Sequence, residues 1–385
     1  MISYKLYNSV INIPTSWDKL TVKDIFLKTN FLNALELSSP DHISSFYLAI
    51  YYNQELVGIA IIQRVEMYLD NIFRKTSDHT LKRLGKAAIA RIVRGNALIV
   101  GNLMHTGQHG YYFNSNKIHA TVFFETVFKA LKSLEKTIKK ESNKTIRIIG
   151  FKDYFKNDVI HLNKHIFNKN SMYKVKVQPN MIFNIPSHFN SISDYKIALN
   201  KKYKRRYNTA IKKSSAIVKK ELLLEDIKLQ GNALYKLYKH VSDQAKVNSF
   251  ILKRNHFYQL KLDLQSNFKI FGYYLNNELI GFYTLILNNS QLETYFLGYN
   301  PRYQQEYQMY LNMLYDMLEY GIDHKFNSVV YARTAMEIKS SVGANPNDMF
   351  IYMKHTNTLF INPLLKFVVN TLNPVKKWEQ RHPFK

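Results

Sequence analysis

The feature that most constrains the fold of this chain is an internal repeat. One nine-residue segment, Tyr51–Ile59 (YYNQELVGI), aligns without a gap with a second one, Tyr274–Phe282 (YLNNELIGF). In each copy an apolar and aromatic run meets an Asn-containing turn, and a second apolar run begins near the glycine. This is the pattern of a β-hairpin with a tight turn. We therefore predict that residues 46–62 and 268–287 form two equivalent hairpins, each within its own mixed sheet.

The segments after each hairpin repeat the same order of elements: a strand, a loop, a helix and a closing strand. The first copy is longer because a helix, Asp78 to Val93, is inserted after its hairpin, and Gly95 would end that helix. In the first copy we expect the strand at 97–101, the helix at 121–140 and the closing strand at 145–150. In the second copy we expect the strand at 292–298, the helix at 307–320 and the closing strand at 328–332.

This order of elements is the core order of the GNAT acyltransferase fold. Two such units in one chain resemble the FemABX-like peptidoglycan aminoacyltransferases and the related FemAB-like GNAT acyltransferases. Residues 31–38 (FLNALELS) resemble the N-terminal segment of that family, 201–208 (KKYKRRYN) its basic helix between the halves, and 333–344 its C-terminal segment. The resemblance covers about residues 17–354. It implies an α/β (α+β) fold with two tandem GNAT-like domains, each a mixed β-sheet flanked by helices.

Composition excludes several classes of protein. The chain has no cysteine, which rules out disulfides, thiolate metal sites and a cysteine nucleophile. It shows neither a secretion signal nor an apolar run long enough to span a membrane, so we expect a cytoplasmic protein. The net charge is +26, from 54 Lys plus Arg against 28 Asp plus Glu. Such a charge attracts nucleic acid, anionic lipid or phosphorylated substrates, although a general bias toward Lys, Asn and Ile would also produce it.

The family resemblance places substrate contacts in the last strand and its exit. The run 338–343 (IKSSVG) resembles an F-K-x-x-F-G segment whose lysine lies at the acyl-transfer centre, with Ile338 in place of the aromatic residue. It implies that Lys339 stabilises developing negative charge, with Arg333 as a second catalytic residue and Tyr331 as a substrate contact. A solvated surface lysine is the alternative reading.

The preceding strand offers further candidates. GNAT enzymes often place a general base there, and this position corresponds to Glu293, with Tyr295 and Tyr299 as substrate contacts. The coenzyme A loop of GNAT enzymes reads Gln/Arg-x-x-Gly-x-Gly/Ala, whereas residues 304–309 read QQEYQM and lack both glycines. The FemABX-like branch has also lost that glycine pattern.

A second loop, residues 101–110 (GNLMHTGQHG), is a better candidate for an anion cradle, because it joins a strand to a helix and contains three glycines. A flexible connecting loop is the alternative. His109 is the candidate acid or base, since imidazole exchanges protons near pH 7. The candidate substrate contacts of this loop are Asn102, Thr106, Gly107 and Gly110. We predict no metal site.

A cluster of basic residues in one segment is more informative about ligands than the net charge of the chain. Residues 196–220 contain ten basic residues and no acidic one, and Leu199, Tyr203, Tyr207 and Ile211 recur every four positions. We therefore predict an amphipathic basic helix at 195–214 that binds phosphate-rich ligands such as tRNA, a nucleotide-linked precursor or lipid headgroups. A merely solvated face is the alternative. The candidate polyanion-binding residues are Lys201, Lys202, Lys204, Arg205, Arg206, Lys212 and Lys213.

The C-terminal segment is apolar and basic. Asn362 can cap a helix that starts at Pro363, and Trp378, Phe384 and several cations follow. This helix either docks on the C-terminal half or rests on the inner face of the cytoplasmic membrane. The predicted division of the chain is a GNAT-like domain at 1–190 with a helical insertion at about 78–94, a GNAT-like domain at 191–357 opened by the basic helix, and this segment at 358–385.

These observations favour an acyl- or aminoacyltransferase that moves an activated acyl group to an amine, in cell-envelope or amino-lipid synthesis. We expect no resident cofactor. The expected partner is an acyl donor, which is acyl-CoA, acyl carrier protein or aminoacyl-tRNA, with tRNA or an anionic membrane surface as a further partner. The alternative function is a non-catalytic protein that binds a polyanion, RNA or anionic membrane, on a degenerate GNAT fold.

Overall fold

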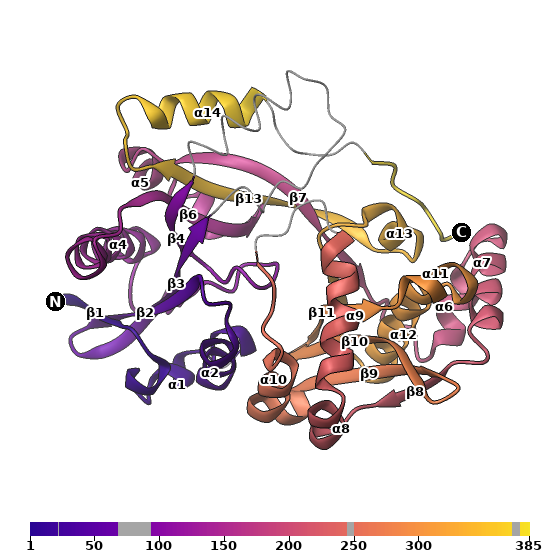
Figure 1. Cartoon of the computed structure of the whole chain (residues 1–385). Coiled ribbons are helices and arrows are strands. Elements are labelled where there is room, and N and C mark those ends of the chain that lie inside the picture. The colour runs from indigo at the N-terminus through magenta and orange to yellow at the C-terminus, as the bar shows by residue number, and fades with distance from the viewer. Residues whose placement is uncertain (22, 68–93, 245–249, 372–377) are drawn as a thin grey trace. The chain divides into compact units, whose positions relative to one another are not determined.

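The computed structural model describes residues 1–21, 23–67, 94–244, 250–371 and 378–385 (Figure 1). The helical insertion predicted at about 78–94 therefore falls almost wholly outside the described residues. The chain forms two compact α/β units, as the fold class predicts. Unit 1 comprises Met1–Gln178, Lys246–Leu252 and Asp348–Lys376, and unit 2 comprises Pro179–Ala245, Lys253–Asn347 and Lys377–Lys385. Two of the changes between the units fall within strands, at 178/179 and 347/348, and the domain limits at 190 and 357 stay predictions.

Unit 1 contains a mixed sheet. Its strands pair in the order β1 (Ile2–Tyr7), β2 (Ile43–Tyr52), β3 (Glu55–Met67), β4 (Gly95–Val100), β6 (Ile146–Phe155) and β13 (Asn345–His355), while β5 (Tyr111–Phe113) pairs with β3. The pair β4 and β6 is parallel, and the others are antiparallel. The strand β7 (Tyr173–Asn184) begins in this unit and continues into unit 2.

Helices cover this sheet on both faces. The long helix α4 (Ala120–Ser142) packs Phe123 and Phe124 into the larger apolar cluster, together with Leu98 of β4. The neighbouring residue Ala97 points the other way, into a second cluster that contains Leu365 of α14 (Ile361–Thr371). Such alternation along β4 is what a strand buried on both faces requires. The other α-helices in the described residues of this unit are α1 (Trp17–Leu20), α2 (Thr29–Ser38) and α5 (Lys164–Lys169).

The two predicted hairpins are confirmed. Strands β2 and β3 pair antiparallel around Asn53 and Gln54, and strands β9 (Phe268–Leu275) and β10 (Glu278–Asn288) pair around Asn276 and Asn277. Both turn residues of each hairpin have positive φ, from 47° to 68°, which is the geometry of a two-residue type I′ turn. Each hairpin also has a bulge one residue before its glycine, between the paired residues Leu56 and Gly58 or Leu279 and Gly281.

Unit 2 repeats the same order of elements, as predicted. Its strands pair in the order β7, β12 (Ser328–Ala332), β11 (Gln291–Tyr299), β10, β9 and β8 (Val218–Glu221). Only the pair β11 and β12 is parallel among these. The helices of unit 2 are α6 (Ile192–Ala198), α7 (Lys201–Lys213), α8 (Leu224–Leu229), α9 (Gly231–Gln244), α10 (His256–Leu264), α11 (Pro301–Tyr307), α12 (Met309–Asp323) and α13 (Met336–Ser341).

Helices α9 and α12 cover opposite faces of the β10–β11 pair (Figure 1). A Cβ atom on Gly298 would lie 2.4 Å from the backbone nitrogen of Tyr238 in α9. A Cβ atom on Gly281 would lie 2.6 Å from Met309 Cε in α12. Glycine at these two positions therefore allows both helices to approach the sheet closely.

The parallel pairs of the two units differ in length. In unit 1, β4 pairs with β6 from Asn96 to Val100. In unit 2, β11 pairs with β12 only from Gln291 to Glu293, although β11 continues to Tyr299. The two strands of unit 2 therefore separate beyond Glu293.

The single basic helix predicted at 195–214 is corrected to two helices, α6 and α7, separated at Leu199 and Asn200. Asn200 caps α7, because its Oδ1 accepts a hydrogen bond from the amide of Tyr203 at 3.2 Å. Leu199 is buried in an extended conformation outside both helices, and Ile211 is 41% exposed, so the four-residue spacing is not one packed stripe. No helix in the described part of the chain is both long and apolar enough to cross a membrane.

Candidate functional site

The exit of β12 in unit 2 has an unusual backbone. Ala332, Thr334 and Ala335 have φ angles of 59°, 67° and 45°, in the left-handed region that disfavours residues with a Cβ atom. Three such residues within four positions are stable only where neighbouring groups hold them. We call residues 331–335 the β12 turn.

Lys339 is the group that holds this turn. It lies in α13, only 5% exposed, and its Nζ donates hydrogen bonds to the carbonyl oxygens of Tyr331, Ala332 (3.3 Å) and Arg333 (2.7 Å). Burial lowers the pKa of Lys339 to about 7, whereas the three carbonyl oxygens favour its ammonium form. Lys339 therefore clamps three successive carbonyl groups, including two that flank the left-handed Ala332.

Arg333 projects from the middle of the β12 turn. Loss of solvent around its guanidinium lowers its pKa to about 10, so it is still charged at neutral pH. A cation with little solvent around it interacts more strongly with an anion than a hydrated one does. The structure thus brings the side chain of Lys339 against the turn that contains Arg333, so the two predicted catalytic residues are neighbours.

The β11 candidates lie near the point where the parallel strands separate. Glu293 is 5% exposed and pairs in register with Val330, next to the β12 turn. Tyr295 is removed from water, which raises its pKa, and its hydroxyl lies 3.2 Å from Nε2 of His256. Tyr299 is half-buried at the end of β11, and burial raises its pKa as well.

Tyr331 is part of the apolar core of unit 2. It is 2% exposed, and its hydroxyl donates a hydrogen bond to the carbonyl of Leu314 at 2.7 Å. Burial raises its pKa well above the ordinary value. Its backbone carbonyl, which binds Lys339, takes part in the turn, while its side chain packs beneath it.

The segment at the coenzyme A position forms a short helix, α11, where the sequence predicts a loop over 299–305. Asn300 caps it by accepting a hydrogen bond from the amide of Arg302 at 3.1 Å, and Pro301 occupies its first position. Gln308, with φ of 48°, then separates it from α12. The amide of Tyr310 at the start of α12 donates to Oε1 of Gln304 at 3.0 Å, so a protein side chain takes up one amide group of this helix start.

Several backbone amides of the loop 101–110 of unit 1 donate hydrogen bonds to side chains of the protein itself. The amide of Gly107 donates to Asp153 Oδ2 at 3.3 Å, and the amide of Gly110 donates to Gln108 Oε1 at 3.1 Å. Asn102 is buried, and its Oδ1 accepts from the amide of Met104 at 2.9 Å. Thr106 is half-buried. The carboxylate of Asp153 beneath the loop opposes an incoming anion, so the role of this loop as an anion cradle is still a prediction.

His109 of this loop has a partner that the sequence does not reveal. Its Nδ1 lies 2.7 Å from Oδ2 of Asp24, 85 positions earlier, in the segment before α2. The ring of His105 stacks on Phe26 at 4.1 Å and tilts toward His109 at 4.9 Å. Burial lowers the pKa of His105 well below its ordinary value, so this ring is neutral. An Asp-oriented imidazole can exchange protons, and the catalytic role of His109 is still a prediction.

The basic residues of α7 are accessible. None of the seven forms an ion pair with another residue in the described ranges. A hollow of about 370 Å³ lies beside them, between α6 and α7, and is lined by Lys196, Tyr207 and Lys212 among others. The predicted polyanion-binding residues Lys201, Lys202, Lys204, Arg205, Lys212 and Lys213 are exposed, and Arg206 is half-buried.

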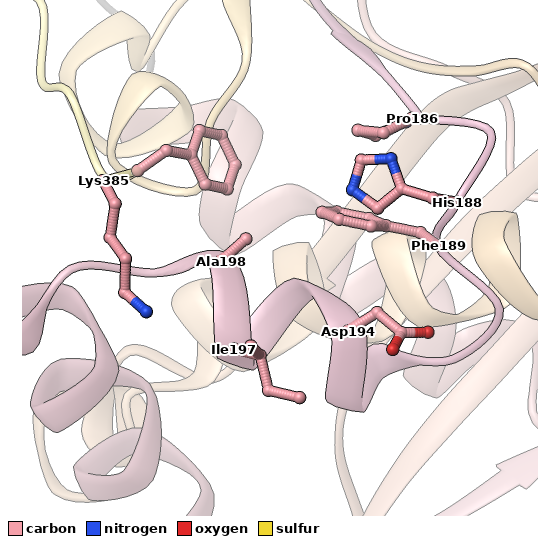
Figure 2. Close-up of a pocket in the computed structure, with 8 residues that line it drawn as sticks. Pro186, His188, Phe189, Asp194, Ile197, Ala198 and Lys385 are labelled. Carbon is pink, nitrogen blue, oxygen red and sulfur yellow. The ribbon is translucent and has the colours of Figure 1, made fainter.

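A larger pocket in unit 2, of about 470 Å³, contains none of the predicted catalytic residues (Figure 2). His188 and Phe189 form one wall, and Lys385 stands on the opposite side (Figure 2). Its acidic residue, Asp194, accepts hydrogen bonds from the amides of Asn190 and Ser191, which lowers its pKa. No group of three His, Asp or Glu side chains in the described residues could hold a metal ion.

The C-terminal residues contact the helix that carries Lys339. The amide of Arg381 donates to Ser340 Oγ at 3.0 Å, and the amide of Asn200 donates to the carbonyl of Pro383 at 2.9 Å. Phe384 packs with Phe183, at a ring distance of 6.0 Å. This segment therefore supports α13 from outside.

Comparison with solved structures identifies the fold. The chain matches the crystal structure of FemX with a TM-score of 0.54 and 9% sequence identity, over 94% of this chain and 99% of that one. It matches a tandem GNAT protein from the clavulanic acid biosynthesis pathway with a TM-score of 0.51 and 6% identity, over 92% and 98% of the two chains. No protein-family profile and no curated protein sequence matches. The predicted FemABX-like tandem GNAT fold is confirmed.

Proposed function

We propose that this chain transfers an acyl or aminoacyl group from an activated thioester or ester to an amine, with the β12 turn of unit 2 at the reacting centre. The observation that carries this proposal is the left-handed turn clamped by Lys339, which contains the partly desolvated Arg333 and follows the point where β11 and β12 separate. Backbone strain stored beside a partly desolvated cation is typical of functional sites. FemX, whose fold this chain shares, supports a transferase of this class by analogy only.

In this reaction the amine nitrogen attacks the acyl carbonyl carbon. The new N–C bond forms, the carbonyl oxygen gains negative charge, and the C–S or C–O bond to the donor then breaks as the amine loses its proton. Arg333 stabilises the negative charge that develops on the acyl oxygen or on a donor phosphate. Lys339 acts as a positioning residue, because its three donors already bind the turn. Glu293, which pairs in register with Val330, is our candidate to accept the proton of the amine.

The direct test is to incubate the purified chain with acyl-CoA, acyl carrier protein and aminoacyl-tRNA and to follow donor retention by native mass spectrometry. One donor should be retained, and an amine acceptor should then release it as an amide. Arg333→Ala should lower this turnover about 100-fold without changing the far-UV circular dichroism. Arg254→Ala is the matched control, since Arg254 of unit 2 is exposed, lies over the ring of Tyr235 and belongs neither to the β12 turn nor to α11. Full turnover in Arg333→Ala would contradict the proposal.

A second candidate function, binding of a polyanion without catalysis, is supported by the unpaired basic face of α7. The segment at the coenzyme A position, filled by Gln304, fits a fold that has lost its donor site. RNA binding that Arg333→Ala leaves unchanged, combined with failure of all three donors to react, would favour this function over transfer.

A further inference from the structure

Helix α14 is anchored to unit 1 by one face. Leu365 is fully buried, in the apolar cluster that contains Tyr173. The side chain of Asn362 donates to the carbonyl of Ser171 at 2.8 Å and accepts from the amide of His355 at 2.8 Å. The predicted docking of this helix on the C-terminal half is therefore corrected. It packs on unit 1, because its buried residues complete the second apolar face of that sheet.

The opposite face of α14 is also apolar, and it is exposed. Phe360 is 77% exposed, Leu364 50% and Phe367 68%. The spacing of three residues places Leu364 and Phe367 on one side of the helix, and Phe360 directly precedes its first residue. Leu359, just before the helix, is 81% exposed and extends the same patch. Four large apolar side chains gathered at one surface mark an interaction site more often than single exposed residues do. We call these four residues the α14 patch.

The charge around this patch has one sign. Residues 349–378 contain no acidic side chain, and the exposed Lys366 lies within α14 itself. Arg147 of β6 lies close enough to His355 to help lower its pKa. The nearest acidic residue before this stretch, Asp348, is paired with Lys176 at 2.7 Å. An apolar helix face on a helix that carries an exposed lysine and no carboxylate of its own is complementary to an anionic lipid surface.

We infer that the α14 patch binds the surface of a bilayer that contains anionic lipid, with the helix lying in the plane of the headgroups. The phenylalanine and leucine side chains enter the boundary of the acyl chains, and Lys366 stays among the lipid phosphates. The predicted membrane contacts Trp378 and Phe384 are not part of this surface, because they pack against the apolar cluster of unit 2. The inference is independent of the transfer chemistry proposed for unit 2.

Sedimentation of the full chain with vesicles tests this inference. One set of vesicles contains phosphatidylcholine alone, and the other contains phosphatidylcholine with phosphatidylglycerol. The chain should sediment with the anionic vesicles, and binding should persist in part at raised ionic strength, where exposed charges are screened. The triple variant Phe360→Ser, Leu364→Ser, Phe367→Ser should bind at least about tenfold more weakly, because the buried apolar area is lost. Its circular dichroism should be unchanged, since Leu365 and Asn362 still anchor the helix.

Two further variants extend the test, one as a control for exposed apolar side chains and one as a test of the positive charge. Leu162→Ser removes another apolar side chain of unit 1, which is 82% exposed, and should leave vesicle binding unchanged. Lys366→Glu should weaken binding to anionic vesicles and leave binding to phosphatidylcholine unchanged. Failure of the wild-type chain to sediment with anionic vesicles would overturn the inference, and so would equal binding by the triple variant. Arg333→Ala should bind vesicles normally even if it abolishes transfer.

Discussion

The closing strands of the two units, β6 and β12, are built alike and end differently. β6 runs parallel to β4 and β12 runs parallel to β11, and each has a bulge with a left-handed residue, Asp153 with φ of 68° in β6 and Ala332 with φ of 59° in β12. In unit 1 the carboxylate of Asp153 accepts a hydrogen bond from Lys152. In unit 2 the lysine at the bulge, Lys339, is held by carbonyl oxygens.

Lys152 is paired with a carboxylate, whereas Lys339 binds three backbone carbonyl groups. The parallel strands also differ, since β4 and β6 stay paired up to Val100 and β11 and β12 separate beyond Glu293. The repeated fold thus supplies the framework twice, and among the described residues the second copy alone combines a lysine-clamped left-handed turn with separated parallel strands. We therefore place the transfer chemistry in unit 2.

Removing the charge of Lys339 should have the largest effect, and it tests directly whether the closing strand of unit 2 differs in function from that of unit 1. Lys339→Met keeps the length and apolar stem of the side chain but leaves three carbonyl groups without their donor. We expect turnover to fall about 100-fold, because Arg333 is no longer held in place. The free energy of unfolding should fall by about 1–3 kcal/mol. Lys228→Met, at an exposed lysine of α8, is the control. Turnover within a few-fold of wild type would mean that the clamp serves the fold alone.

The basic helix α7 of unit 2 can be compared with α4 of unit 1, whose exposed face mixes Lys with Glu. Charge reversal at Lys202 and Arg205 should weaken binding to RNA more than about tenfold and reduce its salt dependence. The matched reversal at Lys136 and Lys140 of α4 should have little effect. Filter binding over a range of salt concentrations measures both. Equal losses in the two helices would assign the binding to net charge and not to the α7 face.

The hairpins could be predicted because their signals are local. Asn53 and Asn276 tolerate the left-handed conformation that a type I′ turn requires, and the glycine four residues after each turn starts the packed half of the next strand. The bulges at these glycines repeat as well. Arg333 and Lys339 came from the family resemblance, and the structure joins them through backbone contacts that their spacing does not specify.

Other features of the site could not be predicted, for physical reasons. Nothing in the composition of the β12 turn indicates positive φ, because Ala332 and Thr334 disfavour it and only tertiary contacts impose it. The pair of Asp24 and His109 joins residues 85 positions apart. The break at Leu199 was missed because this residue fits the apolar spacing of the helix while it packs outside it.

The titration of Lys339 gives a further test of its role at the closing strand of unit 2. Its pKa in the folded chain is about 7, below the value near 10.4 of an unfolded lysine. Between these two values the unfolded chain binds a proton that the folded chain does not, so the free energy of unfolding should rise with pH from about 7 to about 10. Turnover should fall about tenfold from pH ~6 to pH ~8, as the ammonium that clamps the turn is lost.

Lys339→Arg separates the two effects, since its guanidinium stays charged over this range. If Lys339→Arg is active, its turnover should not fall between pH ~6 and pH ~8. An unchanged pH profile in Lys339→Arg would assign the titration to another group, such as the amine acceptor.

The smallest expected effect concerns the glycines of the two hairpins, which face corresponding helices. A Cβ atom on Gly58 would lie 2.9 Å from a ring carbon of Phe123, and one on Gly281 would lie 2.6 Å from the terminal methyl of Met309. The Phe123 ring is fully buried and stacks on Phe113 at 4.7 Å, so it cannot move without disturbing its neighbours. A methionine terminus can rotate away.

Gly58→Ala should therefore lower the free energy of unfolding by about 2 kcal/mol and Gly281→Ala by about 1 kcal/mol, measured by urea unfolding. Gly231→Ala is the control, because an added Cβ there meets no atom within 4 Å. An equal or larger loss for Gly281→Ala would show that α12 packs on its hairpin as rigidly as α4 does. Any difference in rigidity between the two units would then lie in the separated strands β11 and β12, because α12 would pack on its hairpin as tightly as α4 packs on the hairpin of unit 1.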